Sequence, residues 1–140
     1  MATYKLLSLP IKTDSAQRNS CEYQSRKYDL YCKKWRETIA FYRDGLKLLV
    51  ISSNEWFVEF KLNEMSRLSV ADETRTSIKS GDGRGITISL QVSDIEQTRA
   101  ELMDAGITPT SIKEVWGSKA IYVRDPEGNR LEFWAGRARA

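Results

Sequence analysis

The chain has 140 residues, enough for one domain with a buried core. Hydrophobic residues make up 41% of it and charged residues 29%, as in soluble globular proteins, and no apolar stretch is long enough to cross a membrane. The first residues lack the apolar core of a signal peptide, and Cys21 and Cys32 form no metal or redox motif. We therefore expect a cytoplasmic protein with reduced thiols.

The net charge of +3 is unevenly distributed, with ten Lys and Arg against five Asp and Glu in residues 1–50. Lys33, Lys34 and Arg36 surround Trp35, an arrangement that a nucleic-acid-binding patch would also show. No nucleic-acid motif accompanies this basic cluster. We therefore interpret the cluster as the solvent-exposed start of a helix and do not expect nucleic acid as a partner.

Periodicity and turn signals predict an arm or peripheral strand at residues 1–26, followed by a first module at 27–71. The elements expected in this module are a strand at 28–32, a helix at 35–46, and strands at 48–51, 56–60 and 67–71. Residues 72–85 are polar and contain three glycines, so they are expected to form a flexible connection.

A second module at 86–134 repeats the same order, and residues 135–140 form a tail. Its expected elements are a strand at 86–92, a helix that Ser93 or Asp94 caps and that ends near 105, and strands at 112–115, 120–124 and 130–134. Three residues of the first helix recur in the second at one constant offset: Thr38, Ala40 and Asp44 correspond to Thr98, Ala100 and Asp104. These observations predict an α+β fold of two paired βαβββ modules, whose curved sheets surround a cavity.

The last predicted strand follows a tight turn at residues 125–129. Pro126 fixes its own φ, Gly128 and Asn129 tolerate positive φ, and Asp125 can accept hydrogen bonds from amides two residues on. The strand then presents Glu132 among apolar residues. Such a carboxylate is suited to binding a metal or to acting as a base, but the chain has no histidine to serve as its usual partner.

The segments TIAFYRDGL at 38–46, VSDI at 92–95 and DPEGNRLE at 125–132 resemble motifs of the vicinal oxygen chelate superfamily. This superfamily includes glyoxalase I, bleomycin-resistance proteins and extradiol dioxygenases. The resemblance covers about residues 27–134 and implies the same paired modules. Its motifs lie in turns and at helix ends, so they specify the fold better than the chemistry.

Members that use a metal place its ligands on the first and last strands of each module. The resemblance puts these positions at Lys27, near Ser69, at Thr87 and at Glu132, and only Glu132 retains a ligand-type side chain. A protonated lysine repels a cation, and neutral hydroxyl groups are poor ligands. We therefore expect no metal and no other cofactor, which disfavours metal-dependent glyoxalase or dioxygenase activity.

Strand alternation assigns the cavity lining if Lys27 faces inward, and it places Tyr28 beneath the helix. The predicted ligand-binding residues are Lys27, Asp29, Tyr31, Arg67, Ser69, Thr87, Ser89, Arg130, Glu132 and Trp134. We expect Lys27, Tyr31, Thr87 and Glu132 to converge on one point. The same charged residues would also suit structural ion pairs, and we expect Trp56 and Trp116 to pack in the core or at the cavity rim.

Three functions remain open at this point. The first is a metal-free binding protein of the bleomycin-resistance type, for a polar small molecule that is anionic or aromatic. The second is a metal-independent isomerase or lyase that uses Glu132 as its base. The third is an interaction module that docks an acidic partner through the basic N-terminal third. We also expect a homodimer, since modules of this kind pair within or between chains.

Overall fold

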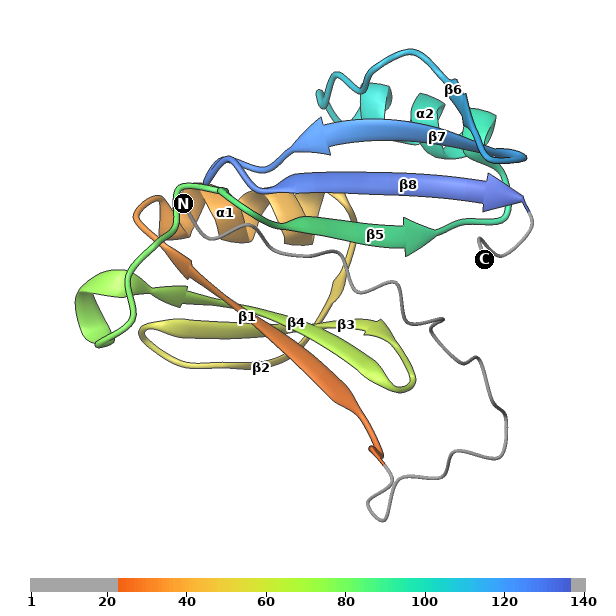
Figure 1. Cartoon of the computed structure of the whole chain (residues 1–140). Coiled ribbons are helices and arrows are strands. Elements are labelled where there is room, and N and C mark those ends of the chain that lie inside the picture. The colour runs from red at the N-terminus through yellow and green to blue at the C-terminus, as the bar shows by residue number, and fades with distance from the viewer. Residues whose placement is uncertain (1–22, 137–140) are drawn as a thin grey trace, which may run out of the picture.

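The computed structural model describes residues 23–136, which form two four-stranded sheets and two α-helices (Figure 1). No helix in this part of the chain is long and apolar enough to span a membrane. Residues 1–22 and 137–140 lie outside the described part, and so do Cys21 and most of the predicted arm.

The first module supplies one complete set of elements. These are β1 (Arg26–Cys32), α1 (Trp35–Ala40), η1 (Phe41–Gly45), β2 (Leu49–Ser53), β3 (Phe57–Asn63) and β4 (Ser66–Asp72). The element η1 is a π-helical turn that continues α1, so helical structure covers nearly all of the predicted helix. A single 3-10 turn, η2 (Glu73–Arg75), opens the connection between the modules.

The second module supplies the same set in the same order. Its elements are β5 (Thr87–Gln91), α2 (Ile95–Asp104), β6 (Lys113–Val115), β7 (Ser118–Arg124) and β8 (Arg130–Gly136). Of the two predicted caps of α2, Ser93 and Asp94, the structure shows Asp94. Its carboxylate accepts a hydrogen bond from the Gln97 amide at 3.0 Å.

The two sheets have equivalent topologies. Their strand orders are β1-β4-β3-β2 and β5-β8-β7-β6, and in each sheet the first strand is parallel to the last while the other pairs are antiparallel. The predicted α+β fold of two paired βαβββ modules is therefore confirmed.

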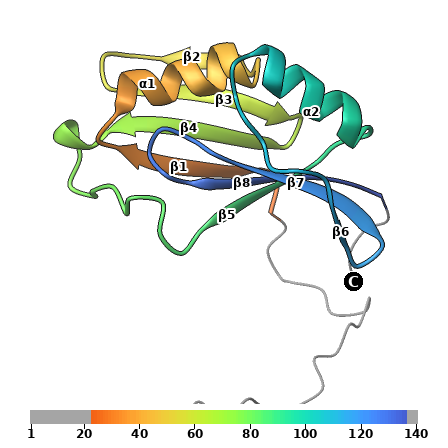
Figure 2. The same ribbon diagram turned by 90° about the horizontal axis from the view of Figure 1, so that it is seen from above.

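One hydrophobic core joins the modules. Phe60 and Val70 of the first sheet belong to the same buried cluster as Ile121 and Leu131 of the second, together with Tyr42 from η1. Figure 2 shows α1 and α2 along the same side of the molecule, where they cover this core. The alternation of apolar and polar residues thus leaves the opposite face of each sheet to polar side chains.

The turn between β7 and β8 connects the second module to the first. The buried Asp125 carboxylate accepts hydrogen bonds from the Tyr42 hydroxyl at 2.6 Å, from the amides of Glu127 and Asn129 at 2.9 Å each, and from Asn129 Nδ2 at 2.9 Å. Burial next to this carboxylate raises the pKa of the Tyr42 hydroxyl well above its usual value, because a second negative charge there would be desolvated and repelled.

Glu127 of the same turn holds the backbone that leads into the first module's helix. Its carboxylate oxygens accept hydrogen bonds from the backbone amides of Lys33 at 2.7 Å and Lys34 at 2.9 Å, just before α1 begins. Lys34, at the N-cap position, has no side-chain cap of its own. A carboxylate from the second module therefore fixes the backbone that enters α1, through the amides of the N-cap residue and of the residue before it.

The structure corrects three expectations. Arg26, assigned to the arm, begins β1. Tyr28 was expected beneath the helix but is 46% exposed, because it lies in the first half of β1, and burial on this strand begins only at Leu30. Trp116 was expected to pack, but it is 83% exposed at the turn between β6 and β7, where it has positive φ; the half-buried Trp56 does pack, against Phe57.

We predict that Tyr42→Phe lowers the free energy of unfolding by about 1–3 kcal/mol, because the buried Asp125 carboxylate loses a charge-assisted hydrogen bond. Tyr28→Phe removes a hydroxyl from an exposed tyrosine and should change stability by less than about 0.5 kcal/mol. Denaturant unfolding of both variants measures the difference. Equal stabilities would show that the bond between Tyr42 and Asp125 contributes little.

Candidate functional site

The polar face of the first sheet carries a network of matched charges. Lys27 Nζ lies 3.4 Å from Asp29 Oδ1 and 4.0 Å from Glu59 Oε1, and Arg67 Nη1 donates to Glu59 Oε2 at 3.0 Å. The buried Ser69 hydroxyl donates to Asp29. Each cation of this group thus has a carboxylate partner, which is the arrangement expected of structural ion pairs.

The polar face of the second sheet is arranged around Glu132, whose carboxylate is nearly buried. It accepts hydrogen bonds from the Ser89 hydroxyl and from the Tyr122 hydroxyl, both at 2.7 Å. Beside it, Arg130 Nε donates to Thr87 Oγ1 at 2.9 Å, and the Arg130 guanidinium lies 4.8 Å from the centre of the Tyr122 ring. This distance is that of a cation–π contact.

The predicted site residues therefore fall into two groups, each joined by hydrogen bonds or ion pairs within its own sheet. Lys27, Asp29, Arg67 and Ser69 form one group; Thr87, Ser89, Arg130 and Glu132 form the other. Tyr31 lies apart from both networks and, with Asp29, lines a small cavity of about 190 Å³ beside the connection. Trp134 is half-buried, two residues beyond Glu132 on β8. The convergence of Lys27, Tyr31, Thr87 and Glu132 on one point stays a prediction.

Two residues of these networks were missed in the sequence. Glu59 is a lone carboxylate on an apolar strand, the same pattern that singled out Glu132. Tyr122 lies directly opposite Glu132 in the ladder between β7 and β8, so the strand alternation at 120–124 would have assigned it to the polar face.

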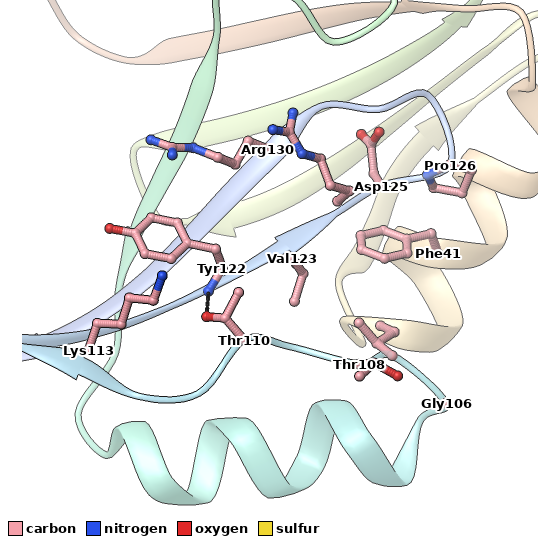
Figure 3. Close-up of a pocket in the computed structure, with 12 residues that line it drawn as sticks. Phe41, Gly106, Thr108, Thr110, Lys113, Tyr122, Val123, Asp125, Pro126 and Arg130 are labelled. Atoms are coloured by element: carbon pink, nitrogen blue, oxygen red, sulfur yellow. Dashed lines mark hydrogen bonds between the residues drawn. The ribbon is translucent and has the colours of Figure 1, made fainter.

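A cavity of about 860 Å³ opens beside the second half of β7 and the loop that follows α2 (Figure 3). Tyr122, Arg130 and Lys113 line one side of it, and Phe41 lies across from them at the end of α1. Thr110 fixes the loop that closes it: its hydroxyl accepts from the Tyr122 amide at 3.1 Å, and its amide donates to the Tyr122 carbonyl at 3.0 Å. The cavity thus combines aromatic rings with cationic side chains.

The four positions that hold a metal in related folds do not fit one here. Lys27 contributes a positive charge and pairs with carboxylates, the Thr87 hydroxyl accepts from Arg130, and the Ser69 hydroxyl donates to Asp29. Within residues 23–136, no three His, Cys, Asp or Glu side chains are placed to hold a metal ion together. Burial and nearby carboxylates raise the pKa of the Cys32 thiol to about 12, so it remains protonated and is a poor ligand.

The geometry defines a protein of two paired βαβββ modules with a polar face on each sheet. A family model for the "Glyoxalase/Bleomycin resistance protein/Dioxygenase superfamily" matches residues 25–133. The chain belongs to this superfamily, as the resemblance of its motifs indicated. No curated protein matches the sequence.

Solved structures share the fold at low sequence identity. A glyoxalase/bleomycin resistance protein/dioxygenase from Nocardioides is 19% identical with a TM-score of 0.71, over 88% of this chain and 89% of that one. A lactoylglutathione lyase from Agrobacterium tumefaciens is 23% identical with a TM-score of 0.67, over 85% and 96%. TnmS3, an antibiotic binding protein from Streptomyces sp. CB03234, is 12% identical with a TM-score of 0.70, over 86% and 100%.

We predict that the purified protein contains no stoichiometric Fe, Ni or Zn, because its donor set offers one carboxylate, two hydroxyl groups and a lysine. Elemental analysis after mild chelation measures this. About one equivalent of such a metal per chain, retained through chelation, would contradict the assignment of these positions.

Proposed function

We propose that this protein binds a small molecule with an anionic group and a flat ring at the polar face of its second sheet, without a resident transition metal. The observation that carries the proposal is the cavity of about 860 Å³ lined by Tyr122, Arg130 and Lys113. Its volume lies within the roughly 300–1,000 Å³ of small-molecule pockets.

The residues around the cavity have complementary roles in this proposal. Arg130 and Lys113 supply positive charge, and Arg130 is held in place by Thr87 on one side and the Tyr122 ring on the other. Glu132 orients Tyr122 by accepting its hydroxyl hydrogen bond. A ligand ring would pack beside Tyr122 and Phe41, with its anionic group toward the cations.

Two solved neighbours illustrate the alternatives of binding and catalysis on this fold. TnmS3 is described as an antibiotic binding protein, whereas the Agrobacterium tumefaciens protein is described as a lactoylglutathione lyase. The absence of histidine from the chain and the lysine at a ligand position support the binding alternative for this protein.

The use of Glu132 as a base is the second candidate function. Its carboxylate lies on the polar face of the sheet, which favours it, but it is only 6% exposed and both oxygens accept hydrogen bonds from hydroxyl groups. These contacts support a positioning role more strongly than proton abstraction, because both carboxylate oxygens are already engaged by hydroxyl donors.

We predict that a thermal-shift screen of antibiotics and aromatic acids yields ligands whose affinity depends on Arg130. Arg130→Ala should weaken binding by about 1–3 kcal/mol, the scale of a charged hydrogen bond. Arg67→Ala, expected from the sequence to have a similar effect, should weaken binding less because Glu59 already neutralises Arg67. Hits that bind equally well to both variants and to wild type would refute the site.

Measurements of affinity and turnover with the ligands from this screen distinguish a binding protein from an enzyme. If Glu132 positions Tyr122, Glu132→Gln should lower affinity, and wild type should leave each hit chemically unchanged on prolonged incubation. A wild type that converts a hit, together with a Glu132→Gln variant that binds it equally well without converting it, would establish the isomerase or lyase function instead.

We also propose that the protein is a homodimer, since family members often dimerise and each single chain leaves part of its polar sheet faces exposed. Sedimentation at tens of micromolar should give twice the mass of the chain. A monomer at that concentration would contradict the proposal. The role of residues 1–26 in assembly and the docking of an acidic partner stay predictions.

A further inference from the structure

Two arginines of the second sheet lie directly opposite each other without a carboxylate partner among the described ion pairs. Arg124, at the end of β7, and Arg130, at the start of β8, are direct partners in the antiparallel ladder, and both are exposed on the same face. Like charges directly opposite each other destabilise a sheet. Their hydrogen-bond partners are neutral: Arg124 Nη1 donates to the Gly128 carbonyl at 2.9 Å, and Arg130 Nε donates to Thr87.

In the first sheet, by contrast, adjacent cations are paired with carboxylates. Arg67 lies opposite both Lys27 and Lys61, and each of these three cations has a carboxylate within 4.0 Å. Among residues 23–136, the ion pairs of this kind do not include Arg124 or Arg130. The second sheet therefore has positive charge that its described carboxylates do not neutralise.

A third arginine is brought to the same place by backbone packing. Arg84 follows Gly83, which lies so close to the turn between β7 and β8 that an added Cβ would be 2.1 Å from the Gly128 carbonyl oxygen. Gly83 also has φ of +74°, so both the conformation and the close approach require glycine. The connection is thus fixed against the turn that separates Arg124 from Arg130.

The three arginines line one cavity of about 520 Å³. The carboxylate in its lining belongs to Asp82, whose Oδ1 accepts from Lys33 Nζ at 2.9 Å. The hydrogen bond and charge of Lys33 lower the pKa of Asp82, with a smaller contribution from Arg84, and the direct ion pair of Asp82 is with Lys33. Arg124 and Arg130 also line the cavity of about 860 Å³ that contains Tyr122 and Phe41, so the two cavities meet at these arginines.

We propose that Arg84, Arg124 and Arg130 form a subsite for a tetrahedral, doubly charged oxyanion, and that the bound small molecule is an aryl phosphate. This inference rests on the proposed function and specifies its ligand class. A carboxylate has two oxygens and matches a single guanidinium, whereas a phosphate monoester has three terminal oxygens for three guanidinium groups. Its aryl ring would extend from this subsite into the cavity beside Tyr122.

Titration calorimetry with phenyl phosphate tests the subsite in the full-length protein, with inorganic phosphate and benzoate as comparison ligands. Phenyl phosphate should bind more tightly than either, because it alone has both the ring and the dianion. Arg84→Ala and Arg124→Ala should each weaken phenyl phosphate binding by about tenfold or more but change benzoate binding much less. The matched control is Arg36→Ala, which removes an exposed arginine of α1 and should leave both affinities unchanged.

The possible failures are distinguishable. Binding of benzoate that depends on Arg130, with no tighter binding of phenyl phosphate, would overturn the subsite and leave the proposed function intact. Failure of wild type to bind any aromatic anion would overturn both. Tighter binding of an oligonucleotide than of phenyl phosphate, lost in Arg84→Ala, would overturn the small-molecule subsite in favour of nucleic acid. Thermal unfolding without ligand checks folding. Arg124→Ala removes a like-charge pair but also the hydrogen bond to the Gly128 carbonyl, so its stability should stay close to that of wild type.

Discussion

The structure depends on the buried carboxylates of the turn between β7 and β8. Asp125 is held by Tyr42 and by amides of its own turn, and Glu127 accepts the amides that precede α1. Two nearly buried negative charges would be strongly destabilising without these donors. The turn therefore stabilises the protein only when the two modules are packed together, and it fixes their relative position.

This constraint also determines where positive charge collects. The turn separates Arg124 from Arg130 and accommodates the connection through Gly83, so Arg84 is added to the pair. In the first module, Lys27 and Arg67 occupy a comparable polar face but are matched by carboxylates. Repetition of one βαβββ unit has thus produced two faces with different electrostatics, one internally neutralised and one with excess positive charge.

The sequence predicted the fold well because alternation, helix caps and turn residues are local signals. The repeated order of elements, the Asp94 cap and the turn at 125–129 were all predicted from neighbouring residues. The point along β1 at which burial begins, which leaves Tyr28 exposed, and the solvent-exposed turn that holds Trp116 depend on tertiary arrangement, so local pattern did not predict them.

The site was harder to predict for the same reason. Strand alternation placed Glu132 and Arg130 on the polar face, and the same alternation would have added Glu59 and Tyr122, but which residues these two contact depends on the register of the sheets. The pairing of Arg67 with Glu59 and the close approach of Gly83 to Gly128 join residues from different strands or modules. Such contacts distinguish a neutralised surface from a binding site, and a single sequence does not reveal them.

Amide hydrogen exchange at the turn, with and without phenyl phosphate, tests most directly whether the same turn joins the modules and organises the site. The amides of Lys33, Lys34, Glu127 and Asn129, all bonded to turn carboxylates, should exchange only through global unfolding, with free energies equal to those of the core strands. Phenyl phosphate should raise all of these free energies by the same amount. Exchange of these amides by local opening, at free energies well below those of the core and unchanged by the ligand, would contradict this account.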